Sequence, residues 1–301
     1  MSGKTLTLPA FAKINWTLRV LGKRTDGYHE IRTVLQTISL HDTLSFTATE
    51  TPHLVLSCDD ETVPAGAENL VCLAAAALQK QFAPHKGAYI RLEKRIPSQA
   101  GLGGGSADAA VTLLALAKLW DTGASEDALS EIAGTLGADV PFFLMGGTAL
   151  ASGTGKDLTA LADAPESFLL VIKPNAVMST TQAYHALNAP SLTTAEAKTI
   201  LSSSQEREFV DNRNPEGLEN DFEVVAFGCE PEIERARAAL LKAGARAALL
   251  AGSGSAVFGV FDNEDGQVRA IQAVKLEPGW RVFPCRTVGR SHYRSAMGPA
   301  A

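Results

Sequence analysis

Two long stretches near the start of the chain, residues 6–21 and 31–48, are rich in Thr, Val, Ile and Leu, which is typical of β-strands. Residues 24–27 between them include the Asp-Gly pair of a turn. Shorter patterns predict two more strands, over residues 53–58 and, by alternation of polar and apolar positions, over 89–95. The chain therefore opens with predicted strands joined by turns.

Helical patterns interrupt and follow these strands. Alanine-rich or periodic apolar stretches predict helices over residues 69–82, 107–119 and 125–136. Asn69 can cap the first of these helices, and the Ser-Glu-Asp sequence from Ser125 suits the start of the third. Since the helices and strands do not alternate regularly, this half is predicted to be α+β rather than a βαβ array.

After a predicted strand over residues 148–152, we place a domain boundary near Pro165, which divides the chain into residues 1–164 and 165–301. Beyond it helices and strands alternate. The predicted helices cover 180–187, 216–227 and 232–243, and the predicted strands cover 168–172, 247–250, 256–261 and 281–284. The polar stretch 191–215 predicts a mobile segment.

Composition narrows the class of protein. A chain of 301 residues with 46% hydrophobic content can bury a core in each of two domains. Its net charge of −6 argues against a nucleic-acid surface, which needs clustered Lys and Arg. The four cysteines include no Cys-x-x-Cys pair, and the histidines no His-x-x-x-His spacing, so neither a disulfide framework nor a zinc site is predicted. Nothing in the sequence indicates an oligomeric state.

The distribution of apolar residues also bears on location. Residues 1–11 have no long apolar region like that of a signal peptide, and no uninterrupted apolar run is long enough to span a bilayer. We therefore expect a cytoplasmic protein without a membrane partner.

A glycine-rich run, residues 101–106 (Gly-Leu-Gly-Gly-Gly-Ser), lies between a predicted strand and a predicted helix. Such a run lets backbone N–H groups surround an anion, and the following helix adds its positive end. It lacks the Lys of a Walker A loop and the third glycine of the Rossmann fingerprint. The run predicts a site for the phosphates of a nucleotide; the alternative is a turn that only packs a helix on a strand.

Three other places combine polar chemistry with apolar or glycine-rich surroundings. Lys13 and Asn15 interrupt an apolar strand, which indicates a site unless Lys13 only extends to solvent from a strand edge. Asp139 precedes the apolar run 140–143 and is either a buried functional acid or a helix N-cap. Residues 252–255 (Gly-Ser-Gly-Ser) are either a loop that closes over the same cleft or a tight hairpin.

These segments resemble, in order and spacing, the three motifs of the galactokinase, homoserine kinase, mevalonate kinase and phosphomevalonate kinase superfamily. The three motifs are residues 9–15, 97–110 and 252–255. Within the superfamily, the chain resembles the kinases of 4-diphosphocytidyl-2-C-methyl-D-erythritol at residues 26–29, Gln36, 40–42 and 137–143. Residues 191–215 and the last forty or so carry no signature of the family.

The resemblance implies an α+β fold of two domains with a cleft between them, an N-terminal domain like ribosomal protein S5 domain 2 and a ferredoxin-like C-terminal domain. It implies ATP-dependent phosphorylation of the 2-hydroxyl of the cytidine diphosphate ester of methylerythritol, giving the 2-phosphate and ADP in non-mevalonate isoprenoid biosynthesis. ATP, Mg²⁺ and this small molecule are the implied ligands. Phosphoryl transfer needs mainly positioning and charge stabilisation, which two glycine loops, a metal ion and one base can supply.

By the same resemblance, Asp139 is the catalytic base and Lys13 is its cationic partner. The methylerythritol end of the substrate is expected at Asn15. The cytosine is expected between two pairs of side chains, Tyr28 and His29 on one side and Thr180 and Tyr184 on the other.

The resemblance also implies the residues that contact the ATP phosphates. They are Pro97, Gly101, Gly103, Gly104, Gly105, Ser106, Gly252, Ser253 and Gly254. The Ser106 hydroxyl is in addition a candidate ligand of Mg²⁺. Lys94 either adds a cation to the triphosphate or forms a solvated pair with Arg95.

Two other functions stay open on the sequence. Another kinase of the superfamily, acting on homoserine or a mevalonate derivative, would not need Tyr28 and His29 to hold a pyrimidine. A non-catalytic sensor could bind ATP and substrate without transfer, although the presence of both Lys13 and Asp139 argues against it.

Overall fold

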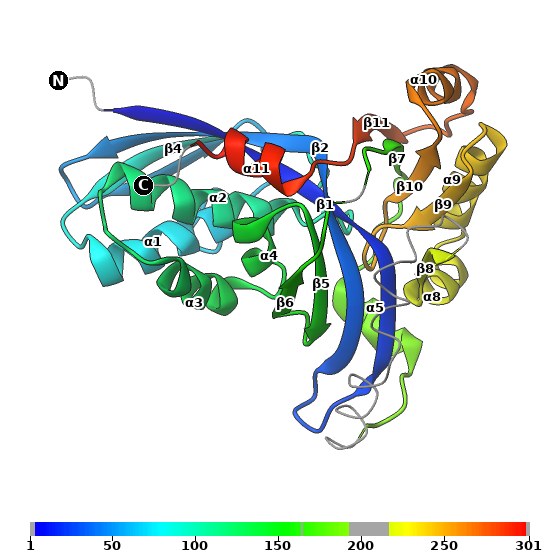
Figure 1. The fold of residues 1–301 in the computed structure, drawn as a ribbon, viewed down its shortest axis with the longest axis horizontal. Coiled ribbons are helices and arrows are strands. Elements are labelled where there is room, and N and C mark those ends of the chain that lie inside the picture. Colours follow the sequence, from blue (N-terminus) through cyan, green and yellow to red (C-terminus); the bar gives the residue numbers. More distant parts are fainter. Residues whose placement is uncertain (1–3, 164, 193–216, 299–301) are drawn as a thin grey trace.

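The computed structural model describes residues 4–163, 165–192 and 217–298. These residues form two β-sheets, each with helices packed against it (Figure 1). Nearly all of the stretch 191–215, which the sequence predicts to be mobile, lies outside the described residues.

The first sheet contains seven strands within the described part of the chain, in the order β3-β4-β2-β1-β8, with β5 pairing to β2 and β6 to β5. Its strands are β1 (Thr5–Lys23), β2 (His29–Thr49), β3 (Leu54–Cys58), β4 (Gly87–Glu93), β5 (Thr148–Gly153), β6 (Asp157–Ala160) and β8 (Glu219–Asn220). The two long strands β1 and β2 are antiparallel and form the hairpin that the sequence predicts.

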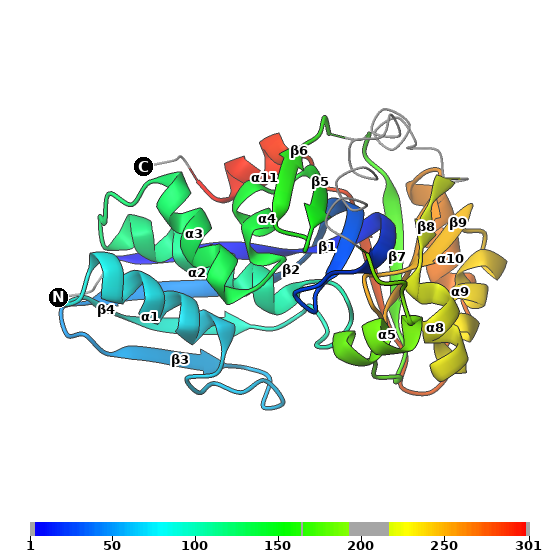
Figure 2. The same cartoon turned by 90° about the horizontal axis from the view of Figure 1, so that it is seen from below.

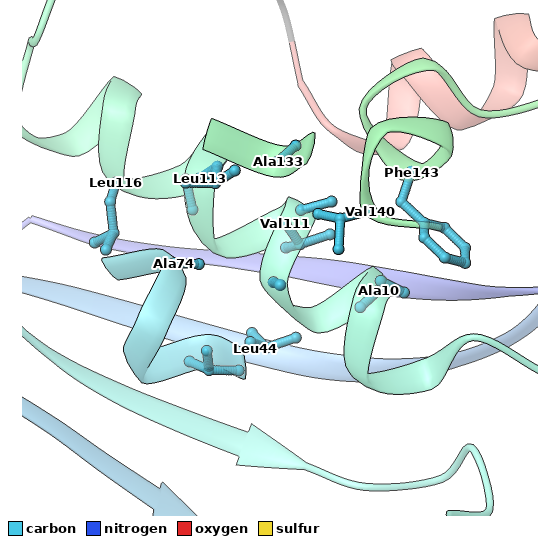
Figure 3. Packing of buried hydrophobic residues seen from close by; sticks show 14 of the residues in the cluster. Ala10, Leu44, Ala74, Val111, Leu113, Leu116, Ala133, Val140 and Phe143 are labelled. Carbon is cyan, nitrogen blue, oxygen red and sulfur yellow. The ribbon is translucent and has the colours of Figure 1, made fainter. Parts of the chain in front are cut away.

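Helices cover one face of this sheet, as Figure 2 shows from below. They are α1 (Leu70–Phe82), α2 (Gly104–Leu119), α3 (Glu126–Leu136) and α4 (Val140–Met145). Ala10 and Leu44 of the central strands pack with Val111 and Leu116 of α2 in one buried apolar cluster (Figure 3). Because α2 is buried along most of its length, its largely apolar composition is stabilising there.

The second sheet is antiparallel, with the strand order β11-β7-β10-β9. Its strands are β7 (Phe168–Lys173), β9 (Ala247–Leu250), β10 (Val257–Phe261) and β11 (Arg281–Arg286), and the helices of this half are α5 (Thr180–Leu187), α8 (Phe222–Cys229), α9 (Pro231–Lys242) and α10 (Glu264–Ala273). Strand order and connections are those of a ferredoxin-like domain. The predicted α+β fold of two domains is confirmed.

The sequence patterns were wrong or silent at several places. The predicted helix 216–227 begins only at Phe222, because Asn220 is held in strand β8: its side-chain amide donates to the carbonyls of Leu250 (2.9 Å) and Gly252 (2.7 Å). Helix α2 begins at Gly104, so three residues of the glycine-rich run form its first turn. Strand β6, helix α10 and helix α11 (Arg290–Ala296) were not predicted.

The chain passes from the first sheet to the second between β6 and β7, and the division at residues 164 and 165 stays a prediction. The helices of the described ranges are all too short or too polar to cross a membrane.

Candidate active site

A pocket of about 1440 Å³ opens between the two halves of the molecule. Residues of β1, β2, α2 and α5 line it, together with the β9–β10 hairpin. All the site residues predicted from the sequence line this pocket except Gly254. Segments far apart along the chain therefore meet at one opening.

Lys13 lies at an irregularity of β1, where the pairing with β2 shifts register between Phe11 and Lys13. Such a bulge re-aims a side chain, and here the backbone N–H of Lys13 donates to the carbonyl of Leu102 (2.9 Å) in the glycine-rich run. The side chain is only 5% exposed, and its ammonium donates to Asn15 Oδ1 at 2.9 Å. The alternative of a lysine that extends to solvent is therefore wrong.

Asp139 precedes the short helix α4. It occupies the cap position, but its backbone is already helical and its carboxylate accepts no capping hydrogen bond from the described helix. Instead, Asp139 Oδ2 lies 3.6 Å from Lys13 Nζ, with the carboxylate side chain 39% exposed to the pocket. The interpretation of Asp139 as a simple N-cap is wrong, and the arrangement leaves a carboxylate oxygen accessible beside a cation.

The glycine-rich run wraps closely around this pair. Gly101 and Gly103 have positive φ values of +74° and +72°, which favour glycine. A Cβ at Gly103 would come within 2.7 Å of the Phe143 ring and 3.1 Å of the Lys13 stem. The loop thus brings the first turn of α2, including Gly105 and Ser106, to the pocket that Lys13 and Asp139 also line. The backbone N–H groups of this turn can bind an anion there.

The second glycine-rich segment joins the antiparallel strands β9 and β10, so it is the hairpin that one interpretation expected. It also contacts the first loop. Ala256 N donates to the carbonyl of Ala100 (3.2 Å), and a Cβ at Gly101 would lie 1.9 Å from the carbonyl oxygen of Ala251. Gly252 is close to the Lys13 ammonium, since a Cβ there would lie 3.2 Å from it.

Asn15 extends the polar chain from Lys13 along β1. Its amide nitrogen donates to Thr33 Oγ1 at 2.7 Å, and the Thr33 hydroxyl in turn donates to the carbonyl of Thr17 at 2.6 Å. This chain fixes the orientation of the Asn15 amide in a buried position at the pocket.

Aromatic side chains gather at the far end of the pocket. The rings of His29 and Tyr184 are stacked, with centroids 4.5 Å apart, and Phe222 meets Tyr184 edge-on at 4.8 Å. Tyr28 next to them is 67% exposed, so one ring is free to meet a planar ligand. Burial, and to a smaller degree the charge of Asp139, raises the pKa of Tyr184 to about 12. Burial, and then the nearby charge of Lys23, lowers the pKa of His29.

Thr180, the first residue of α5, links the aromatic end of the pocket to the end lined by the glycine-rich loops. Its hydroxyl lies 3.0 Å from the Ser253 hydroxyl in the β9–β10 hairpin. A residue predicted for the pyrimidine and a residue predicted for the phosphates are thus direct neighbours.

Lys94 is 7% exposed and lies between two carboxylates, Asp42 Oδ2 at 2.5 Å and Asp108 Oδ2 at 3.0 Å. The interpretation as a solvated Lys-Arg pair is therefore wrong. Burial alone would lower the pKa of Lys94, but the charges of Asp108 and Asp42 outweigh burial and raise it. The ammonium also lies next to Gly104, where a Cβ would be 3.2 Å away, so it is close to the start of α2.

Sequence reasoning missed Asp108 as a member of this cluster. The signal was present: a lone carboxylate stands in the apolar run from Ala107 to Val111, as Asp139 stands before its own apolar run. Val63, Pro64, Glu68, Asn69 and Leu70 also line the pocket without having been expected there, and the sequence indicates Asn69 only as a helix cap. Gly137 and Lys156 are among the further unpredicted lining residues near Asp139.

A bound Mg²⁺ would find few protein ligands here. The described residues contain no cluster of three or more His, Cys, Asp or Glu groups, and the acids Asp42 and Asp108 are engaged by Lys94. The Ser106 hydroxyl lines the pocket at the start of α2 and fits a magnesium ion whose other ligands are phosphate oxygens and water.

Comparison with known proteins agrees with this geometry. Residues 69–147 match the N-terminal domain of the GHMP kinases, and residues 204–278 match their C-terminal domain. A protein of Citrifermentans bemidjiense named 4-diphosphocytidyl-2-C-methyl-D-erythritol kinase is 40% identical over 285 residues, which cover 95% of this chain and all of that protein. The chain belongs to the GHMP kinase family.

Other proteins similar to this chain carry the same name as the Citrifermentans protein. The protein of Pelotomaculum thermopropionicum is 45% identical over 257 residues, which cover 85% of this chain and 88% of that protein. A crystal structure of 4-(cytidine 5'-diphospho)-2C-methyl-D-erythritol kinase superimposes with a TM-score of 0.77 at 36% identity, covering 94% of this chain and all of that one. Homoserine kinase from Cytophaga hutchinsonii, at 18% identity and a TM-score of 0.69 over 96% of each chain, shares the fold.

Proposed function

We propose that this GHMP kinase transfers the γ-phosphoryl group of ATP to the 2-hydroxyl of 4-diphosphocytidyl-2-C-methyl-D-erythritol, in non-mevalonate isoprenoid biosynthesis. The observation that carries the proposal is the contact between Lys13 and Asp139, 3.6 Å apart at the point where two glycine-rich loops meet. The relatives that match nearly the whole chain support the substrate. We also propose a cytoplasmic location, where ATP is supplied.

Asp139 acts as the base. Its exposed carboxylate accepts the proton of the substrate 2-hydroxyl as that oxygen attacks the γ-phosphorus. The new O–P bond forms while the bond between the γ-phosphorus and the β,γ-bridging oxygen breaks, and ADP leaves. The Lys13 ammonium, held by Asn15, stabilises the negative charge on the transferring group.

The loops hold the triphosphate in line with this hydroxyl. Backbone N–H groups at the start of α2 surround the phosphates from one side, and the Gly252–Ser253 end of the hairpin lies on the other. A magnesium ion, when bound, neutralises phosphate charge, and the Ser106 hydroxyl would help to hold it. Because Lys94 is held by two carboxylates that offset its charge, we propose that it contributes to the phosphate site by fixing the start of α2.

The aromatic end of the pocket is proposed to hold the cytosine. The exposed Tyr28 ring offers one stacking face. His29, expected on the same side as Tyr28, stacks directly on Tyr184 instead, and this pair forms the opposing wall. Groups here that pair with the exocyclic amino group of cytosine would be left unpaired by uracil, which presents a carbonyl oxygen at that position.

An ADP-release assay tests the proposal. With Mg-ATP, we expect rapid turnover of the cytidyl substrate and none above background with free methylerythritol, homoserine or mevalonate. The matched uridyl ester is expected to lose about a hundredfold or more in kcat/KM, because a buried polar partner is left without its hydrogen bond. EDTA is expected to stop turnover, and excess MgCl₂ to restore it. Preferred turnover of homoserine or mevalonate, or equal use of both pyrimidine esters, would overturn the assignment.

A further inference from the structure

The last described helix, α11, belongs by sequence to the second half but packs on the first (Figure 1). After β11, Val288 N donates to the carbonyl of Thr37 at 2.8 Å, and Gln36 Nε2 donates to the carbonyl of Val288 at 3.0 Å. These bonds anchor the chain to β2 before α11 begins. The start of α11 is thereby held against the first sheet.

Arg290, the first residue of α11, binds backbone at the end of α4, at the start of β5 and just after β6. Its guanidinium donates to three carbonyl oxygens, those of Gly146 (3.2 Å), Leu161 (3.0 Å) and Thr148 (2.5 Å). Its own backbone N–H donates to Asp163 Oδ2 at 2.7 Å. One cation therefore ties the C-terminal end of α4, at Gly146, to the start of β5 and to the residue after β6, and a positive charge is favourable at a helix C-terminus.

Tyr293, one turn further on, touches both elements that carry the catalytic pair. Its ring is buried, and its hydroxyl donates to the carbonyl of Phe143 in α4. The ring packs so closely on Gly146 that a Cβ there would lie 2.3 Å from it. On its other side it meets the ring of Phe11, with centroids 5.7 Å apart, two residues before Lys13 on β1.

Helix α4 needs such support because it has only six residues, far below the length at which a helix is stable alone. Asp139 at its N-terminal end gives it no side-chain cap within the described structure. The position of Asp139 therefore depends on what holds the rest of α4.

We propose that α11 is a positioning element for the catalytic pair, with Tyr293 and Arg290 as positioning residues that set the separation of Lys13 and Asp139. This rests on the proposed function of that pair. Neither residue lines the pocket or touches a ligand site, so each acts through the elements it holds.

Tyr293→Phe is the test, because it removes one hydroxyl and keeps the ring. The matched control is Tyr89→Phe, the same change on an exposed tyrosine of β4 outside the pocket. We expect Tyr293→Phe to lower kcat about tenfold at a temperature where it is fully folded, with KM for ATP and for the cytidyl substrate changed less than twofold. The control is expected to match the wild type.

Two further measurements separate positioning from a general loss of stability. In an Asp139→Asn background, Tyr293→Phe is expected to cause no further fall in kcat, since its effect acts through Asp139. Hydrogen exchange of backbone amides over residues 140–147 is expected to speed up about tenfold or more in Tyr293→Phe, while exchange in α2 stays unchanged.

An unchanged kcat in Tyr293→Phe, or a fall that persists in the Asp139→Asn background, overturns the proposal. Unchanged exchange over residues 140–147 overturns it even if the wild type shows no kinase activity, a result that would separately remove the proposed function. If Tyr293→Phe does not fold, Arg290→Lys serves the same tests, because one ammonium cannot reach three carbonyls at the positions of the guanidinium donors.

Discussion

At the scale of single residues, partners decide what a charged side chain does. Lys13 lies within a predicted strand and Lys94 near the end of another, and for each the sequence allowed a solvated lysine. Both ammonium groups are buried, but Lys13 meets one half-exposed acid, whereas Lys94 lies between two buried ones. The Lys13 pair leaves a carboxylate oxygen of Asp139 open to a substrate. The Lys94 cluster instead holds together the elements that carry it.

Asp139→Asn tests the role of the open acceptor. The amide cannot take the proton of the hydroxyl, so we expect kcat to fall by about a thousandfold or more. The dissociation constant of Mg-ATP is expected to stay within about threefold of the wild type, because Asp139 contributes no capping hydrogen bond to α4 within the described residues. Steady-state kinetics and calorimetric titration of the nucleotide measure the two quantities.

Asp265→Asn, on an exposed position of the first turn of α10, is the control for that substitution. It is expected to behave as the wild type in both measurements. If Asp139→Asn weakens Mg-ATP binding as much as turnover, the carboxylate supports the loop rather than the chemistry.

At the scale of elements, the sequence predicted what local pattern determines. The hairpin of β1 and β2, helices α1 and α3 and the site around residues 101–106 each have a periodic or compositional signal within their own segment. Strand β8 has no such signal, because its two residues are strand only through pairing with Thr17 and Leu18 of β1. Helix α4 is too short to show a period. Helix α11 buries chiefly Tyr293, which packs against residues distant in the sequence.

The contact between the two glycine-rich loops could likewise not be seen in the sequence, and Gly101→Ala tests it. A Cβ would lie 1.9 Å from the carbonyl oxygen of Ala251, a backbone atom that cannot move aside cheaply, so the loops must separate. We expect KM for ATP to rise about tenfold or more, with loss of stability beyond the cost of an alanine at φ +74°.

Gly123→Ala is a matched control for this clash. Gly123 has a similar φ of +63°, and a Cβ there would meet no atom of the described residues within 4 Å. Its effect is expected to be only the backbone cost of about 1 kcal/mol, with KM for ATP unchanged. Equal kinetic effects of the two substitutions would show that the loop contact is not needed for nucleotide binding.

At the scale of the whole molecule, one buried cluster of charged side chains joins the first sheet to helix α2. Through this cluster, the stability of the fold depends on pH. Asp42 of β2, Lys94 after β4 and Asp108 of α2 join three elements. Both carboxylate oxygens of Asp42 are hydrogen-bonded: its Oδ1 accepts from the backbone N–H groups of Arg95 (2.5 Å) and Ile96 (2.8 Å), and its Oδ2 accepts from the Lys94 ammonium. Asp108 has fewer partners, and its Oδ1 is buried with no hydrogen-bond partner among the described residues.

Burial, reinforced by the nearby charge of Asp42 and opposed by that of Lys94, raises the pKa of Asp108 to about 8. The ordinary aspartate pKa is about 3.9, so between about pH 4 and pH 8 the folded protein keeps a proton that the unfolded chain has lost. The stabilisation from this proton is complete below about pH 4 and is lost as the pH rises through about 8.

Asp108→Asn removes this titration while keeping a carbonyl oxygen for Lys94. Measured by urea unfolding from pH 5 to pH 8, the free energy of unfolding of the wild type should fall relative to that of Asp108→Asn, by on the order of 1 kcal/mol per pH unit. An exposed-acid control, Asp265→Asn, should follow the wild type throughout. A difference in free energy of unfolding between wild type and Asp108→Asn that stays constant over this range, or that grows in favour of the wild type as the pH rises, would mean that Asp108 is already ionised in the folded protein beside Lys94.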